Sequence, residues 1–270
     1  MADVELPWPS KNAIDDLVQQ ASGLFICAST VIKFVDSKHS RPDRQLGRIL
    51  KVGGQSDVTS ALDSLYLEVI STSDSHSHGH GHSILEVIVM ILDPLPIRDL
   101  ASLLAEPIGE LRLSLHELQS VLSVPEDENE PVRIYHTSFR DFLVDTHRAL
   151  KVSIDQPSCH GNIARLCLQL MVKELRRDIC GISSPSKLNS EIPELHNMCN
   201  ESITGALQYA CRYWASHLSK SEISDGLLLD LRSFAFKSLL YWFEALSLLG
   251  RFNEDVLPAI QMASVWLKVC

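Results

Sequence analysis

The stretch that most constrains the fold runs from residue 121 to residue 147, VLSVPEDENEPVRIYHTSFRDFLVDTH. Two short apolar runs, residues 121–124 and 132–135, flank an acidic turn that is bounded by Pro125 and Pro131. Short apolar runs on either side of such a turn predict two antiparallel strands. The stretch therefore predicts a β-hairpin.

A helix is predicted directly after this hairpin. The motif SFRD, which begins at Ser138, has the S-x-x-D form of a capping box, the usual start of a helix. Phe139, Phe142 and Leu143 follow at positions i, i+3 and i+4, which places them on one helix face. His136 lies at the joint, where a polar side chain could reach out of the fold toward a ligand. The alternative is that His136 is only a structural residue of the joint.

Upstream of the hairpin, apolar residues spaced three or four apart predict further helices. One helix of about six turns is expected from residue 14 to 35, although Gly23 inside it would weaken it by about 1 kcal/mol. A second helix is expected over residues 61–70. Two shorter helices are expected over residues 97–104 and 108–122, and Pro96 suits the start of the first of them. Helix, break, helix, hairpin and helix together predict a winged helix-turn-helix over residues 84–150.

Downstream of residue 150 the sequence predicts only helices. Three apolar stripes include Trp214 and Trp242, both of which we expect to be buried, and Gly250 is expected to end the third helix. The Ser-, Pro- and Gly-containing segment 180–195 predicts a long loop between the first two. We interpret the stripes as core. The predicted fold is mainly α, a helical bundle with a winged-helix module that carries a small β-hairpin.

Composition excludes several classes of protein. The net charge of −10 argues against non-specific binding to nucleic acid or to an anionic membrane, because both need clustered cations. The seven cysteines are scattered without C-x-x-C spacing, as expected of free thiols in a reducing compartment. Neither a signal peptide nor an apolar run of the roughly 18 residues needed for a membrane span is apparent. We therefore expect a cytoplasmic protein without a membrane partner.

No self-contained catalytic motif is found, since P-loop, G-x-S-x-G and H-E-x-x-H patterns do not occur. We therefore expect no enzyme activity and no cofactor. His76, His78, His80 and His82 alternate in the polar segment 71–83, which is predicted to be a linker. Imidazoles at this spacing could chelate Zn²⁺, Ni²⁺ or Cu²⁺ weakly. A Gly/Ser-rich segment offers no preorganised second shell, so we expect no functional metal site.

The helix-turn-helix raises the alternative of a DNA-binding regulator. A reading helix normally presents Arg, Lys, Asn or Gln to bases and phosphates. The candidate helix 108–122 offers Arg112 and Gln119, but also Glu110 and Glu117. Together with the overall acidity, this favours a winged helix that acts inside the protein, with no nucleic-acid partner.

Six segments resemble the region that follows the nucleotide-binding core in fungal NACHT-type proteins, members of the signal-transducing ATPases with numerous domains (STAND). They are WPSKNAIDDLVQQASGLFICASTVIKFV, LDSLYLEVI, HELQSVLSVPEDENEPVRIYHTSFRDFLVD, LCLQLMVKELRRDICGI, LQYACRYWASHL and YWFEALSLLG, in the family's order. The resemblance implies that residues 1–70 are the end of a NACHT module with its helical lid. It implies a winged helix over 84–150 and a helical arm over 151–270.

The resemblance also implies a role for His136, which in YHTSFRDFL matches a histidine that reaches the β-phosphate of bound ADP and holds a closed state. This chain lacks the P-loop, the acidic Mg²⁺-binding strand and the repeats of the family, so we expect a truncated, non-catalytic regulatory fragment. It would couple nucleotide state to conformational switching in innate-immunity-like signalling, with protein partners or an upstream NTPase core. A stand-alone helical interaction scaffold remains a further alternative.

Overall fold

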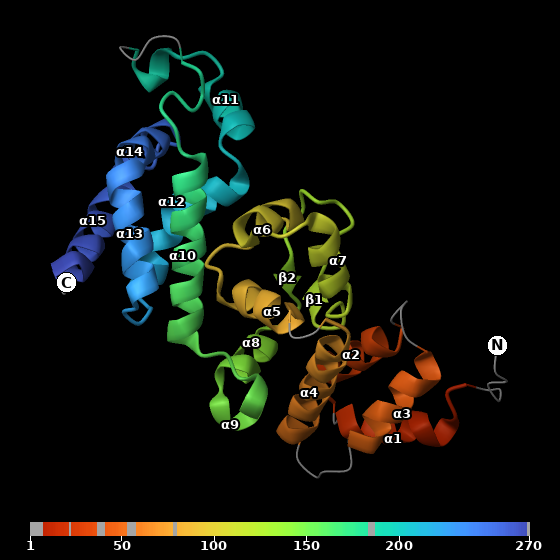
Figure 1. Ribbon diagram of the computed structural model, residues 1–270. Helices are drawn as coiled ribbons and strands as arrows, with labels where there is room; N and C mark the ends of the chain where they lie inside the picture. The colour runs from red at the N-terminus through yellow and green to blue at the C-terminus, as the bar shows by residue number, and fades with distance from the viewer. Residues whose placement is uncertain are drawn as a thin grey trace. The chain divides into compact units, whose positions relative to one another are not determined.

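The structure, a computed structural model, describes residues 8–21, 23–36, 41–52, 58–77, 80–182 and 187–268. This part of the chain is mainly helical, as predicted, with fifteen α-helices and one two-stranded antiparallel sheet (Figure 1). It forms two compact units. The first unit comprises Met1–Val89, Gly109–Asp127 and Pro131–Ile154, and the second comprises Met90–Ile108, Glu128–Glu130 and Asp155–Cys270. No helix among the described residues is both long and apolar enough to cross a membrane.

The first unit combines a group of four helices with the hairpin and the short helices that follow it. Helices α1 to α4 pack against one another, α4 also contacts α9, and α8 contacts β2. The elements are α1 (Lys11–Ala21), α2 (Phe25–Val35), α3 (Pro42–Val52), α4 (Val58–Ser77), α5 (His80–Met90), α7 (Ile108–His116), β1 (Leu122–Ser123), β2 (Arg133–Ile134), α8 (Thr137–Val144), α9 (Thr146–Ala149) and a 3-10 turn (Leu150–Val152).

The long helix predicted over residues 14–35 is wrong, because two helices occupy this segment. Gly23 has a φ of +82° and lies between α1 and α2. The Leu24 amide donates to the Ala21 carbonyl at 2.7 Å, which closes the turn. A positive φ is readily available to glycine, so the chain can change direction here while the apolar spacing continues across the break. Helix α3 lies between the segments 14–35 and 61–70, in a part of the chain for which no helix was predicted.

The described part of the segment 71–83, which was predicted to be a polar linker, is helical. Helix α4 continues to Ser77 and α5 begins at His80. The hydroxyls of Ser71 and Thr72 both donate to the carbonyl of Glu68, at 3.0 and 2.7 Å. Serine and threonine side chains inside a helix often bond back to a carbonyl of the preceding turn in this way. The domain boundaries drawn at residues 70 and 84 stay a prediction.

The hairpin is confirmed, with Leu122 paired to Ile134 and Ser123 paired to Arg133. The helix predicted over 108–122 ends earlier, at His116, and turns lead from it into β1. Leu118 and Leu122 are fully buried although neither lies in the helix. The leucine spacing therefore indicated burial correctly, but a turn and a strand can bury leucines as well as a helix can.

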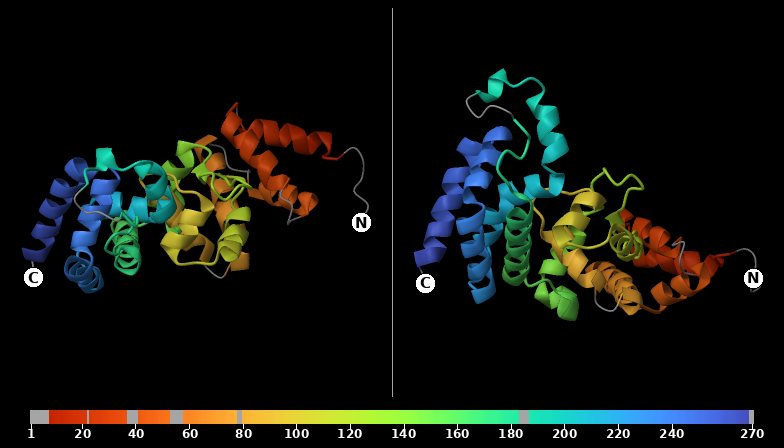
Figure 2. Two further views of the ribbon diagram at one scale, coloured as in Figure 1. Left: turned by 90° about the horizontal axis from the view of Figure 1, so that it is seen from above. Right: turned by 45° about the horizontal axis from the view of Figure 1, so that its top comes forward.

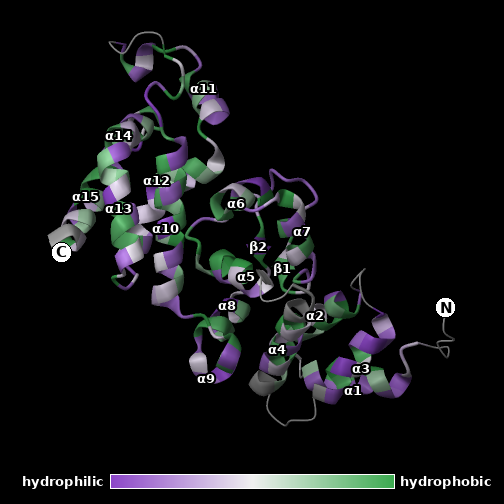
Figure 3. Cartoon of the chain, in the orientation of Figure 1, coloured by the Kyte–Doolittle hydropathy of each residue, from purple (hydrophilic) through white to green (hydrophobic). Residues whose placement is uncertain are grey.

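The second unit is built around α12, which packs against α6, α10, α14 and α15 (Figure 2). Hydrophobic and hydrophilic residues alternate along α10 and α13, as expected of helices with one buried side (Figure 3). The predicted loop 180–195 contains a 3-10 turn (Asn189–Glu191) in its described part. The elements are α6 (Ile97–Leu104), α10 (Gln156–Glu174), α11 (Leu195–Ser202), α12 (Gly205–Leu218), α13 (Asp225–Lys237), α14 (Leu239–Leu248) and α15 (Phe252–Lys268).

An aromatic cluster forms the core of this unit and confirms the predicted burial of both tryptophans. Trp214 is 2% exposed and Trp242 is fully buried. Their rings lie 5.7 Å apart edge to face, and Phe234 packs against both at 5.2 and 5.9 Å. The indole of Trp242 donates to the Cys211 carbonyl at 2.9 Å. Gly250 ends α14 with a φ of +69°, also as predicted.

Candidate functional site

The candidate site is the junction between β2 and α8, where His136 is the N-cap residue of the helix. Its backbone is extended, and its side-chain Nδ1 accepts a hydrogen bond from the backbone N–H of Ser138 at 3.1 Å. The prediction that Ser138 is the cap is therefore wrong, since Ser138 is the second residue of α8. The imidazole nitrogen takes over the role that a serine or aspartate oxygen usually has, which is to satisfy a free amide of the first turn.

Ser138 instead connects His136 to the core of the first unit. Its Oγ lies 2.7 Å from Nδ1 of His136 and 2.8 Å from the hydroxyl of Tyr66. Tyr66 comes from α4, is 1% exposed, and packs against the rings of Phe139 and Phe142 at 4.9 and 5.4 Å. Burial raises the pKa of Tyr66, so its hydroxyl stays protonated at neutral pH. An exposed histidine is thus joined to a buried phenol by one serine.

A second polar link joins α4 to the end of this segment. Asp63, one turn before Tyr66 on α4, accepts two hydrogen bonds from the guanidinium of Arg148, at 2.6 and 2.9 Å. Such a bidentate pair fixes orientation as well as distance. Asp145 caps α9 by accepting from the backbone N–H of His147 at 2.9 Å. The helices that follow the hairpin are therefore held against α4 at two places.

This arrangement presents one imidazole with its Nδ1 occupied and the ring exposed to solvent. The neighbouring Tyr135 is 45% exposed, and the ammonium of Lys33 lies 2.9 Å from its ring centroid. A neutral imidazole can donate one hydrogen bond from its remaining nitrogen to an oxygen atom of a ligand. The alternative, a purely structural His136 that caps α8, is compatible with the same hydrogen bond to Nδ1.

Of the four histidines in the segment 71–83, the side chains of His76, His78 and His80 lie outside the described residues. Nε2 of His82 lies 3.5 Å from the carboxylate of Glu86, one turn later on α5. Within the described part of the chain, no group of three or more His, Cys, Asp or Glu side chains could hold a metal ion.

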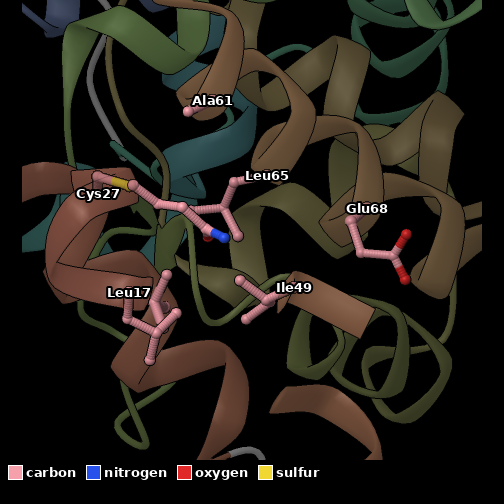
Figure 4. A pocket seen from close by; sticks show the side chains of 8 residues that line it. Leu17, Cys27, Ile49, Ala61, Leu65 and Glu68 are labelled. Atoms are coloured by element: carbon pink, nitrogen blue, oxygen red, sulfur yellow. The ribbon is translucent and has the colours of Figure 1, made fainter. Parts of the chain in front are cut away.

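A cavity among α1 to α4 is too small to bind an organic ligand. Its lining includes Leu17, Cys27, Ile49, Leu65 and, at one edge, the carboxylate-bearing Glu68 (Figure 4). The volume of about 20 Å³ has room for about one water molecule. Burial raises the pKa of the Cys27 thiol, so this cysteine is a poor nucleophile.

A wider hollow of about 460 Å³ opens in the second unit between α11, α12 and the end of α14. Its amide groups are already engaged. The side chain of Asn189 donates to the Ser247 carbonyl at 2.7 Å, and Gln208 donates to the Ile203 carbonyl at 2.9 Å. Because these groups are bonded to the protein, the hollow offers fewer free polar groups than its lining suggests.

A buried histidine pair in the second unit is a functional candidate that the sequence did not indicate. Nδ1 of His160 lies 2.8 Å from Nδ1 of His217, and Nε2 of His217 lies 2.7 Å from the hydroxyl of Tyr209. That hydroxyl accepts from the backbone N–H of Leu92 at 3.0 Å. Burial, with smaller contributions from His160 and Lys220, lowers the pKa of His217 to about 3. Since both histidines are buried, we interpret the cluster as part of the core.

The chain is 28% identical to the vegetative incompatibility protein HET-E-1 of Podospora anserina, over an alignment that covers 76% of this chain. The same alignment covers 16% of that relative, so the chain spans about a sixth of its length. No protein-family model matches the chain, and no solved structure matches it. This similarity supports a relationship to fungal NACHT-type proteins only loosely.

Proposed function

We propose that the chain is the non-catalytic regulatory part of a NACHT/STAND-type signal-transduction protein. The observation that carries the proposal is His136, an exposed imidazole held by its Nδ1 at the junction of hairpin and helix. The similarity to HET-E-1 supports the same family. In this proposal His136 contacts a phosphate of ADP when an NTPase core is present, and the contact favours a closed state.

The proposal assigns a place to each block of the chain. Residues 1–70 correspond to the end of a NACHT module with its helical lid, residues 84–150 to a winged helix, and residues 151–270 to a helical arm. The protein would act in the cytoplasm, with an upstream NTPase core or other proteins as partners. Nucleotide state would then control a conformational switch in innate-immunity-like signalling.

The energy of one such contact suffices for a switch. A hydrogen bond from the imidazole to a phosphate oxygen is charge-assisted and contributes about 1.5–3 kcal/mol. A closed state that is favoured by only a few kcal/mol would lose most of its bias without it. Removal of His136 should therefore release ADP faster and make assembly easier.

The test joins an upstream NACHT core from a close relative to this chain and compares His136→Ala with the parent. We expect ADP to be lost about 10- to 100-fold faster, together with easier oligomerisation. His147→Ala is the matched control, because His147 is also an exposed histidine of the first unit, eleven positions further along the chain. Unchanged ADP retention with a lowered melting temperature would show that His136 is only a structural residue.

The same proposal predicts that the 270-residue chain alone neither hydrolyses ATP nor binds it tightly. The backbone amides and lysine of a P-loop, together with Mg²⁺, supply most of the affinity and catalysis in P-loop NTPases. This chain contains no P-loop motif. Isothermal calorimetry and a phosphate-release assay check the prediction, and micromolar ATP binding with turnover above the buffer blank would contradict it.

The DNA-binding alternative gains no support from the helix that would read the bases. Arg112 on α7 donates to the backbone carbonyl of Glu126 in the hairpin turn, at 3.2 Å, and approaches the carbonyl of Pro125 at 3.5 Å. A guanidinium used in this way holds the turn of the hairpin. We therefore keep the regulatory proposal and do not propose a nucleic-acid partner.

A further inference from the structure

The hydrogen bonds around His136 determine which ring nitrogen carries its proton. Nδ1 lies 3.1 Å from the backbone nitrogen of Ser138 and accepts from its N–H. A nitrogen that accepts a hydrogen bond must offer its lone pair, so Nδ1 carries no proton. The proton of the neutral ring is then on Nε2, because the bond made by one ring nitrogen sets the state of the other.

The serine and tyrosine hydroxyls reinforce this choice. Ser138 Oγ is 2.7 Å from the same Nδ1, so its proton points toward the ring. Because the one proton of the Ser138 hydroxyl is used in this bond, the serine oxygen accepts a hydrogen bond from the Tyr66 hydroxyl, which lies 2.8 Å away. Burial keeps this phenol in its protonated form, so it remains a donor. Tyr66 therefore donates to Ser138, and Ser138 donates to Nδ1 of His136.

We propose that Tyr66 and Ser138 are positioning residues that hold His136 as the Nε2–H tautomer, so that its exposed nitrogen donates a hydrogen bond to a phosphate oxygen of a nucleoside diphosphate. The choice of ligand rests on the function proposed above, whereas the tautomer follows from the geometry alone. The opposite tautomer would turn a lone pair toward the phosphate oxygen and repel it. The chain of hydrogen bonds from Tyr66 through Ser138 to His136, called the relay below, thus decides whether the histidine attracts or repels such a ligand.

The relay also makes the nucleotide contact depend on the position of α4. Tyr66 belongs to α4, whereas Ser138 and His136 belong to the start of α8. The pair between Asp63 and Arg148 holds the same helix against the segment after the hairpin. A movement of α4 that broke the contact between Tyr66 and Ser138 would weaken the preference for the donor tautomer. A rearrangement of α4 can in this way change the tautomer of His136 although the imidazole does not contact α4 directly.

The tautomer can be measured on the 270-residue chain itself, without nucleotide. Histidine-selective ¹⁵N labelling with long-range ring correlation spectra reports each ring nitrogen as protonated or bare. At a pH where His136 is neutral, we expect only the Nε2–H form. Exposed His147 serves as the internal reference for an unconstrained ring. His136→Gln identifies the signals to be followed.

Three variants separate the relay from general packing. Tyr66→Phe keeps the ring that packs on Phe139 and Phe142 but removes the hydroxyl, and Ser138→Ala removes the intermediate oxygen. Each should shift the Nδ1 resonance of His136 and move its tautomer population toward the mixture shown by His147. Ser138→Thr retains a hydroxyl and should restore the parent spectrum, which a role in packing alone would not predict.

Two results would overturn the proposal. One is an Nδ1–H form, or a mixture equal to that of His147, in the parent chain. The other is a pair of His136 ring resonances that Tyr66→Phe and Ser138→Ala leave unchanged while both variants remain folded by near-ultraviolet circular dichroism. The ADP-retention assay tests the proposed function independently of the tautomer. If His136→Ala left ADP retention unchanged, the nucleoside diphosphate would no longer be the proposed ligand, but the tautomer assignment would still hold.

Discussion

Acidification should destabilise the second unit through His217, and this prediction can be worked out in numbers. His217 is completely buried, and its hydrogen-bond partners His160 and Tyr209 are uncharged when the histidines are neutral. Burial lowers its pKa in the folded protein to about 3, against 6.5 for an ordinary histidine. The unfolded chain therefore binds a proton in a pH range where the folded chain does not.

The sign follows from this difference in bound protons. The pKa of His217 is lower in the folded protein than in the unfolded chain. The stability that neutral His217 contributes is therefore fully present above pH 6.5 and is lost as the pH falls toward 3. Each pH unit in that window costs about 1.4 kcal/mol, so acidification to pH 5 should cost about 2 kcal/mol. A cost of this size is a large fraction of the stability of a typical domain.

The assay is urea unfolding at pH 7.5 and pH 5, followed by tryptophan fluorescence, because three of the four tryptophans, Trp214, Trp242 and Trp266, lie in the same unit as His217. His217→Gln has no titratable group at this position, and its loss of stability between the two pH values should be about 2 kcal/mol smaller. Titrating groups that do not contact His217 are shared by both proteins and cancel. His147→Gln is the control that should leave the pH dependence unchanged. Equal pH dependence in His217→Gln and the parent would refute the reasoning.

Trp214→Ala should cost about 3–5 kcal/mol, because it empties the centre of the aromatic cluster, and an unchanged thermal midpoint would contradict the buried assignment. Asp63→Asn should cost about 1–2 kcal/mol in chemical unfolding by removing the charge from the pair with Arg148, whereas no loss of stability would show that the pair is energetically neutral. Gly23→Ala should cost about 1 kcal/mol through backbone strain alone, since its φ is +82° and, apart from its chain neighbours, no atom of the described residues lies within 4 Å of an added Cβ. A cost above about 3 kcal/mol for Gly23→Ala would indicate a packing role instead.

Local patterns in the sequence were sufficient to predict the fold class. The apolar stripes of α10, α12 and α14 predicted helices, and the two short apolar runs around an acidic turn predicted the hairpin. The burial of Trp214 and Trp242 followed from the same periodicity. Periodicity worked here because a helix or strand must place its apolar residues on one side to bury them.

Predictions failed where one local pattern is compatible with two structures. The apolar spacing across Gly23 suits one long helix as well as two shorter ones, and only the positive φ distinguishes them. The S-x-x-D motif marked a helix start within two residues, but His136 took the capping role from Ser138. Competition between neighbouring side chains for the same backbone amides depends on the chain path into the helix, which the motif does not contain.

His136 itself was indicated by the sequence, from its place between a predicted strand and a predicted helix. What makes it a candidate donor was decided by the tertiary structure. Tyr66 and Ser138 are 72 positions apart, and Asp63 and Arg148 are 85 apart. Nothing in helical or strand periodicity selects such partners, since the period only says which side of an element is buried. The packing of α4 on the segment after the hairpin brings these groups together and gives His136 the hydrogen bonds that orient its ring.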